Sequence, residues 1–177
     1  MGYMNPPRSI LIVVTRRIGD VLLATPLIRS VKRAWPDAAI DVLVFAGTEG
    51  VLAANPDIRR VLTVAERPSG WDHVKLMAAI ARRYDVALST VPSDRPTLYA
   101  WLAGRWRAGL VVDAPKHRWK KHLLHRSVAF DNRDTIYSGS SDDAALNKTI
   151  KRYTAEPKAV EYVRQWVTAN GHTHDPV

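Results

Sequence analysis

The residues whose types and spacing favour chemistry lie in one short turn, TRRIGD, at residues 15–20. The carboxylate of Asp20 can accept a proton from a ligand hydroxyl as a general base. Gly19 beside it has no Cβ, so a ligand can approach the backbone closely. Arg16 and Arg17 belong to the same turn, and a guanidinium group binds phosphates and carboxylates through paired hydrogen bonds. The turn therefore predicts a site for a hydroxylated, anionic ligand.

Asp20 also has a purely structural interpretation. Aspartate is a preferred N-cap residue, and its charge complements the dipole at a helix N-terminus. Spacing alone favours this capping role over the role of a base. Two nucleotide-binding motifs are excluded, because the dinucleotide fingerprint needs three glycines where this turn has one, and the sequence holds no Walker A motif.

The turn needs a strand before it and a helix after it to hold these side chains in place. Residues 10–14 form a continuous apolar run, which indicates a buried strand. Beyond the turn, apolar residues recur with the spacing of one helical face: Leu27, Ile28, Val31, Ala34 and Trp35. Strand, turn and helix open a parallel α/β sheet, in which ligands bind at the carboxyl edge. Pro26 either lies in the first turn of this helix, with Thr25 as N-cap, or kinks a longer helix.

The rest of the chain continues this alternation. Further strands are expected at residues 40–45, 61–65, 85–90, 108–112 and 128–130, and helices at 47–55, 71–84 and 97–104, the last with Gly104 as its C-cap. Asp94 and Arg95 follow the fourth strand in a polar loop at 92–95, where they either contact a ligand or form a loop ion pair. A mobile polar loop at 136–143 and helices at 144–153 and 157–170, with Gly171 as C-cap, complete the pattern.

Composition limits the class of protein. With 177 residues, the chain is long enough for one domain with a sizeable core. It has no cysteine, which excludes disulfides, thiolate metal sites and a cysteine nucleophile, and which fits a cytosolic protein. No apolar run approaches the ~20 residues of a membrane span, and the run after Arg8 is too short for a signal peptide. The chain is therefore expected to be soluble, or to lie on a membrane without crossing it.

The net charge of +9 suggests an anionic partner: a nucleic acid, an anionic membrane or a phosphorylated ligand. Basic residues are densest at residues 116–126, KHRWKKHLLHR. This run is interpreted as a patch for phosphate or anionic lipid, as a nonspecific nucleic-acid contact, or as a solvated loop. Its three histidines show no complete zinc pattern, so no metal site is predicted. The absence of any D-x-D pair also argues against a metal-held nucleotide sugar.

Residues 10–44 resemble a known family. This stretch, ILIVVTRRIGDVLLATPLIRSVKRAWPDAAIDVLV, is similar to the N-terminal region of the lipopolysaccharide heptosyltransferases, glycosyltransferase family 9. The family's Gly-Asp pair, Thr-Pro pair and P-D-A-x-I-D-x-L-V strand match Gly19-Asp20, Thr25-Pro26 and residues 36–44. The segments NPDIRRVLTV, RRYDVALST and LAGRWRAGL extend the similarity to Arg133, whereas DTIYSGSSDDAALN departs from the pattern.

The resemblance implies a GT-B glycosyltransferase with two Rossmann-like domains, of which residues 10–155 would form the acceptor-binding one. Transfer would be inverting and independent of metal, with Asp20 as the catalytic base. The acceptor would be an anionic glycolipid of the lipopolysaccharide core. Beside Asp20, the residues expected to bind substrate are Arg16, Arg17, Gly19, Arg59, Arg60, Asp94, Arg95, Lys120 and Lys121.

The resemblance also implies partners and a location. No cofactor is expected, and the nucleotide-sugar donor, such as ADP-heptose, would bind a C-terminal domain. Because the family's chains are about twice as long, that domain is expected to be missing and the chain alone to be inactive. Residues 1–9 would form a leader, and 156–177 a C-terminal helix and the start of the link. The expected location is cytoplasmic, with peripheral contact to the inner face of the inner membrane. A nucleic-acid-binding module and a catalytically inactive interaction module are the alternatives.

Overall fold

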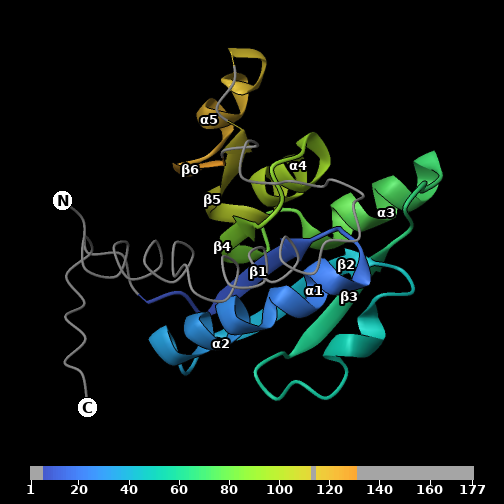
Figure 1. Cartoon of the computed structure of the whole chain (residues 1–177), viewed down its shortest axis with the longest axis vertical. Coiled ribbons are helices and arrows are strands. Elements are labelled where there is room, and N and C mark those ends of the chain that lie inside the picture. Colours follow the sequence, from blue (N-terminus) through green and yellow to red (C-terminus); the bar gives the residue numbers. More distant parts are fainter. Residues whose placement is uncertain (1–5, 113–114, 131–177) are drawn as a thin grey trace, which may run out of the picture. The chain divides into compact units, whose positions relative to one another are not determined.

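The computed structural model describes residues 6–112 and 115–130, which belong to one compact unit, Asn5–Phe130. These residues contain a six-stranded sheet in which all neighbouring strands are parallel (Figure 1). The strands are β1 (Ser9–Val14), β2 (Ala39–Phe45), β3 (Arg60–Val64), β4 (Tyr84–Ser89), β5 (Gly104–Val112) and β6 (Arg126–Phe130). Their order across the sheet, β3-β2-β1-β4-β5-β6, is that of the Rossmann fold. The α/β, Rossmann-like class predicted from the sequence is confirmed.

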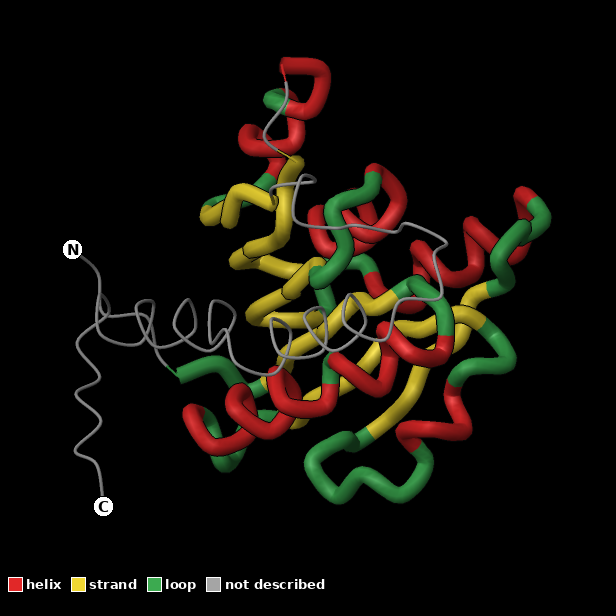
Figure 2. Tube along the Cα trace, in the orientation of Figure 1, coloured by secondary structure: helices red, strands yellow, loops and turns green. Residues whose placement is uncertain are grey.

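Helices connect these strands, as the crossovers of a parallel sheet require. The elements between strands are α1 (Ile18–Leu23), α2 (Thr25–Ala34), η1 (Glu49–Leu52), α3 (Gly70–Ile80), α4 (Asp94–Ala103), η2 (Pro115–His117) and α5 (Trp119–Leu123), where η marks a 3-10 helix. The crossover from β1 runs toward one edge of the sheet, and those into β4 and β5 run toward the other. Right-handed crossovers therefore place α2 on one face and α3 and α4 on the opposite face. Figure 2 shows helices on both sides of the strands.

Strand β1 forms the centre of the domain. The side chains of residues 10–13 have no exposed surface, as expected for a central parallel strand that is covered on both faces. Leu11 and Val13 pack into a core with Ile80 of α3 and Tyr99 of α4. Successive strand residues point to opposite faces, so the neighbours of Leu11 and Val13 face the side of α2. This double burial fixes the position of the turn that follows β1.

The Thr25-Pro26 pair separates α1 from α2. Helix α2 begins at Thr25, and Pro26 lies in its first turn, where the missing N–H breaks no helical hydrogen bond. The Oγ1 atom of Thr25 donates to the carbonyl of Leu22 at 2.8 Å, at the end of α1. Pro26 thus starts a new helix and does not kink a longer one. The N-cap position belongs to Ala24, not to Thr25 as predicted.

Strand β5 is longer than predicted and begins at Gly104. Gly104 does cap α4, but its backbone is extended, with φ −96° and ψ 143°. A Cβ at this position would lie 2.6 Å from the Cβ of Ala87 on β4 and 2.6 Å from the carbonyl oxygen of Trp106. The glycine is therefore required for the close approach of β5 to β4, and not for a left-handed helix end.

Several expected features lie outside the described residues. They are the first five residues of the leader, the polar loop at 136–143, the helices at 144–153 and 157–170, Gly171 and the link at 156–177. The end of the expected leader is described, and it is attached to the sheet: the backbone N–H groups of Arg8 and Ser9 donate to Oδ2 of Asp85 at 2.9 and 3.1 Å. Within the described ranges, no helix has the length and apolar character needed to cross a membrane.

Candidate functional site

The order of the strands reverses between β1 and β4. The chain leaves β1 for β2 on one side and later crosses back to β4 on the other side. Loops that follow two such strands diverge and leave a crevice at the carboxyl edge of the sheet, where α/β proteins bind ligands. Residues 15–17 and α1 follow β1, and residues 90–93 precede α4 after β4. Asp20 of α1 therefore belongs to the edge at which the sequence predicted the site.

The carboxylate of Asp20 has no partner within the described part of the chain. Asp20 is the third residue of α1 and is half-buried. The N-cap position belongs to Arg17, and no side chain caps the helix. The backbone N–H of Asp20 donates to the carbonyl of Arg17 at 3.0 Å, but no described residue forms a hydrogen bond or ion pair with its side chain. The capping role that spacing favoured is therefore wrong, and no described residue occupies the carboxylate of Asp20.

The residues that precede Asp20 leave the space beside it open. Gly19 is exposed, and a Cβ built on it would meet no atom within 4 Å. Arg16 and Arg17 are also exposed, and neither guanidinium group is bound by a described residue. The structure thus brings together, in residues 16–20, a carboxylate, an open glycine and two cations that a ligand can reach.

The loop after β4 is fastened to the end of β1. The backbone N–H and the Oγ1 atom of Thr90 both donate to the carbonyl of Val13, at 3.2 and 3.0 Å. Asp94 begins α4, and its Oδ1 forms an ion pair with Nζ of Lys120 at 2.6 Å. Arg95 donates from Nη1 to the carbonyl of Glu66 at 2.7 Å. The loop ion pair is therefore formed by Asp94 with Lys120, and Arg95 supports a different loop.

Lys120 is an internal cation. Its side chain is 1% exposed, and besides the ion pair with Asp94 its Nζ donates to the carbonyl of Pro92 at 3.2 Å. A side chain so deeply buried does not reach a ligand on the surface, so the structure separates Lys120 from the other expected substrate contacts. Lys121, which follows it on α5, is exposed.

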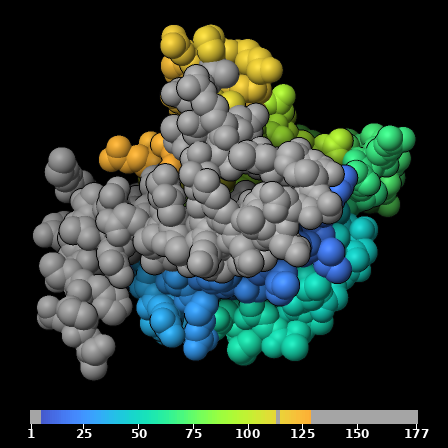
Figure 3. Space-filling model, viewed as in Figure 1, coloured from blue at the N-terminus to red at the C-terminus, as the bar shows by residue number. Residues whose placement is uncertain are grey.

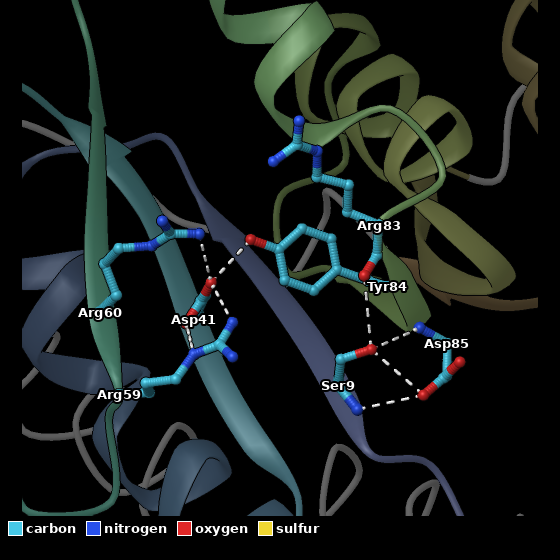
Figure 4. A network of polar contacts seen from close by, with 7 residues as sticks. All are labelled: Ser9, Asp41, Arg59, Arg60, Arg83, Tyr84 and Asp85. Carbon is cyan, nitrogen blue, oxygen red and sulfur yellow. Dashed lines mark hydrogen bonds and ion pairs between the residues drawn. The ribbon is translucent and has the colours of Figure 1, made fainter.

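Arg59 and Arg60 do not join the site around Asp20. They lie at the amino end of β3, on the edge of the sheet opposite to the turn after β1, and both bind Asp41 of β2 (Figure 4). Arg59 donates from Nε and Nη2 to the two carboxylate oxygens at 2.9 and 2.8 Å, and Arg60 donates from Nη2 at 3.0 Å. The hydroxyl of Tyr84 on β4 donates to the same carboxylate at 2.7 Å. The two arginines neutralise a buried anion and are not placed to contact a ligand at Asp20.

This network keeps Asp41 ionised. Burial alone would raise the pKa of the Asp41 carboxyl group, but hydrogen bonds from Arg59, Tyr84 and Arg60 outweigh burial and hold that pKa below its ordinary value. Burial and the neighbouring Asp41 raise the pKa of Tyr84, which stays protonated as a donor. Sequence reasoning missed this cluster. Its signal was a charged residue inside the apolar strand AIDVLVF, because a buried charge requires partners.

Within the described ranges, no three His, Cys, Asp or Glu side chains gather as a metal ion would require. His125 of the basic run accepts a hydrogen bond at Nδ1 from the backbone N–H of Arg107, at 3.2 Å, and so joins the end of the run to β5. The metal independence of the expected reaction stays a prediction.

Sequence comparison identifies relatives of this chain. No family model matches it. Two curated proteins from Escherichia coli, both named lipopolysaccharide heptosyltransferase 3, are 29% and 30% identical to it over 108 and 114 residues. The aligned regions cover 60% and 63% of the chain, but only 29% and 32% of the relatives. The chain thus spans less than a third of the length of these relatives.

Solved structures share the fold. The chain superposes with a TM-score of 0.59 on the crystal structure of the glycosyl transferase family 9 from Veillonella parvula DSM 2008, at 18% identity over 81% of this chain and 40% of that one. The TM-score is 0.57 for the E. coli heptosyltransferase WaaC with ADP, at 19% identity over 83% and 47% of the two chains. It is 0.54 for the E. coli ADP-heptose lps heptosyltransferase II, at 22% identity over 71% and 36%. In sequence and in fold, the chain is thus related to the lipopolysaccharide heptosyltransferases over part of their length, as its Gly-Asp and Thr-Pro pairs predicted.

Proposed function

We propose that the described domain is the acceptor-binding side of a glycosyltransferase. The enzyme would transfer a heptose-like sugar from a nucleotide-sugar donor to a lipopolysaccharide core acceptor. One observation carries the proposal: the carboxylate of Asp20, which has no partner among the described residues, follows β1 where the strand order reverses. The name of the two E. coli relatives supports the class of sugar and acceptor. The donor would bind outside the described residues, and no further cofactor would be needed.

Asp20 would act as the base of an inverting transfer. The acceptor hydroxyl oxygen attacks the anomeric carbon while the bond from that carbon to the diphosphate oxygen breaks. The proton of the hydroxyl passes to the Asp20 carboxylate, and the nucleoside diphosphate leaves with the electron pair. Attack opposite to the leaving group inverts the configuration, and no step requires a metal. Such a base must lie within about 2.6–3.2 Å of the hydroxyl oxygen, so position decides its efficiency.

The basic residues near this edge would bind the charged parts of the acceptor. Arg16 and Arg17 are exposed and can form charge-assisted hydrogen bonds to its phosphates or carboxylates. Gly19 leaves room for a sugar beside the carboxylate. Lys121 and the other exposed cations of residues 116–126 would draw the domain toward an anionic glycolipid at the cytoplasmic face of the inner membrane.

Binding to the chain alone separates acceptor recognition from donor recognition. Deacylated lipopolysaccharide core oligosaccharide and ADP are each titrated into the chain by calorimetry. The oligosaccharide is expected to bind, and the variant with both Arg16→Ala and Arg17→Ala to bind it at least about tenfold more weakly, because each lost hydrogen bond to a charged group contributes about 1.5–3 kcal/mol. Binding of ADP together with no binding of the oligosaccharide would contradict the proposal.

Transfer is tested after addition of a donor-binding domain, produced separately from an E. coli heptosyltransferase, with release of ADP from ADP-heptose as the signal. Asp20→Asn should slow release by about 10²–10⁴-fold, the usual contribution of a general base, with an unchanged circular dichroism spectrum. Asp37→Asn is the matched control, since Asp37 is exposed and follows α2. Near-normal release by the Asp20 variant would refute the assignment of the base.

A further inference from the structure

Lys120 joins an exposed carboxylate to an exposed indole. Its Nζ lies 2.6 Å from Oδ1 of Asp94 and 5.9 Å from the ring centre of Trp119. The lysine side chain is 1% exposed, whereas that of Asp94 is 64% exposed and Trp119 is 43% exposed. Because both contacts share the same nitrogen, the carboxylate and the ring are held close together, and both remain accessible to a ligand.

This arrangement is a costly way to stabilise a fold. A buried ammonium group loses its hydration, and its ion pair with a largely exposed partner is weakened by water. A well-packed apolar side chain at this position would fill the same space without that cost. The lysine does, however, fix the direction of the Asp94 carboxylate and anchors it to the loop after β4 through the carbonyl of Pro92.

We propose that Asp94 and Trp119 form a sugar subsite, in which Lys120 is a positioning residue. The ligand is a neutral, hydroxylated sugar ring. Its hydroxyl groups donate to the Asp94 carboxylate, which has accepting capacity beyond the ion pair. The C–H face of the ring packs on the exposed face of the Trp119 indole. A sugar ring has polar hydroxyl groups and apolar C–H faces. The Asp94 carboxylate, as a hydrogen-bond acceptor, matches the hydroxyl groups, and the Trp119 indole matches a C–H face.

The charge of the subsite selects a neutral sugar. The positive charge of Lys120 is balanced by Asp94, so this pair offers no excess charge to a phosphate. A phosphate placed next to the Asp94 carboxylate would meet repulsion. Anionic groups of a ligand would bind instead to Arg16 and Arg17, whose guanidinium groups have no partner among the described residues, and to the exposed cations of residues 116–126 around the subsite.

The subsite belongs to the same edge of the sheet as Asp20. Asp94 follows β4, and α5 with Trp119 follows β5, while β4 lies between β1 and β5. The yellow surface of the α5 segment is open to view in Figure 3. The inference rests on the proposed function in one respect: the ring bound here would be a second sugar of the acceptor, one that lies away from the reacting hydroxyl. Sugar binding itself requires no transfer.

The experiment uses the full chain with its six tryptophans labelled with ¹⁵N, so that each indole N–H gives an NMR signal. The Trp119 signal is assigned from the Trp119→Phe variant. Deacylated lipopolysaccharide core oligosaccharide should shift this signal, and inorganic phosphate should not. Asp94→Asn, which changes an exposed side chain, should weaken oligosaccharide binding by about tenfold, as expected for one hydrogen bond to a charged group. Trp119→Ala should weaken it as well.

Trp71→Ala is the matched control, because Trp71 of α3 is 67% exposed and no part of the subsite. It should bind the oligosaccharide as the unchanged chain does. Lys120→Met tests the positioning role and should lose affinity as Asp94→Asn does. If that variant does not fold, the two exposed positions still decide the question. The inference is overturned if saturating oligosaccharide leaves the Trp119 signal in place, or if Asp94→Asn and Trp119→Ala bind normally. It is also overturned if only phosphatidylglycerol vesicles shift the signal, because the indole would then contact lipid.

Failure of the subsite and failure of the proposed function give different results. Asp20→Asn should slow transfer by about 10²–10⁴-fold and leave the oligosaccharide-dependent shift of the Trp119 signal intact. A shift without any transfer in the assembled enzyme would reject the proposed reaction and keep the subsite. Transfer without a shift of the Trp119 signal would reject the subsite and keep the proposed reaction.

Discussion

Arg59 and Asp41 meet side by side, with Nε and Nη2 of the guanidinium group donating to the two carboxylate oxygens at 2.9 and 2.8 Å. The carboxylate has no exposed surface, whereas the side chain of Arg59 is 52% exposed. The pair thus connects the interior of β2 to the solvent-facing start of β3, together with Arg60 and Tyr84. Arg59, Arg60 and Tyr84 all donate to the one buried carboxylate of Asp41. We therefore expect removal of that carboxylate to lower the free energy of unfolding more than removal of an ion pair on the surface.

Asp41→Ala should lower the free energy of unfolding by about 3 kcal/mol, because it leaves the Tyr84 hydroxyl buried and the arginines without their anion. Urea unfolding followed by circular dichroism measures the change. Asp37→Ala, at an exposed position, should change stability by less than about 0.5 kcal/mol. Equal stability of the two variants would show that the network does not stabilise the domain.

The same carboxylate makes stability depend on pH. The pKa of Asp41 is lower in the folded chain than its ordinary value of 3.8, so the unfolded chain binds the proton more readily. The stabilisation is therefore complete above the ordinary pKa and is lost as the pH falls through the folded one. The difference in unfolding free energy between the unchanged chain and Asp41→Asn should stay constant from about pH 7 to 5 and shrink below about pH 4. If the difference in unfolding free energy stayed the same from about pH 7 to below about pH 4, the lowered pKa of Asp41 would be contradicted.

Gly104→Ala should destabilise the domain by about 1–3 kcal/mol, the usual cost of an added methyl group in a packed region. Its Cβ would lie 2.6 Å from the Cβ of Ala87 and 2.8 Å from the backbone nitrogen of that residue. Thermal unfolding measures the loss. Gly50→Ala is the control, because a Cβ there meets nothing within 4 Å. An unchanged melting temperature for Gly104→Ala would mean that β4 and β5 can move apart at no cost.

Gly19→Ala should separate stability from binding. Within α1, alanine is favoured over glycine by about 0.5–1 kcal/mol, and the added methyl group meets no atom within 4 Å. The variant should therefore be at least as stable as the unchanged chain, yet bind the core oligosaccharide more weakly, because the methyl group occupies space beside Asp20. Calorimetry and urea unfolding on the same samples test both parts. Unchanged affinity would show that no ligand approaches this glycine.

The sequence was sufficient to predict the elements that rest on local apolar pattern. The run at residues 10–14 became β1 almost to the residue, since a short continuous apolar run is typical of a strand that is covered on both faces. The position of Asp20 at the carboxyl edge followed from that strand. The sequence did not predict that Asp20 lies inside α1 and does not cap it. Whether α1 begins at residue 18 or at residue 21 depends on how the turn packs.

Contacts between distant segments could not be predicted in the same way. Arg59 and Arg60 resembled ligand contacts because the register that pairs Asp41 with Arg60 is set only when β3 joins the sheet. Lys120 was one cation among many in residues 116–126. Its burial depends on the position of Asp94 and Pro92, nearly thirty residues earlier in the chain. Such residues reveal their roles only through tertiary structure.

The two hydrogen bonds from Thr90 to the carbonyl of Val13 have a mechanical consequence. They hold the segments that leave β1 and β4 together where the two strands end, so a hinge motion at this point would have to break both hydrogen bonds. In the proposed enzyme, adaptation to acceptors of different size would therefore come from rotation of exposed side chains such as those of Arg16 and Arg17, with little movement of the backbone.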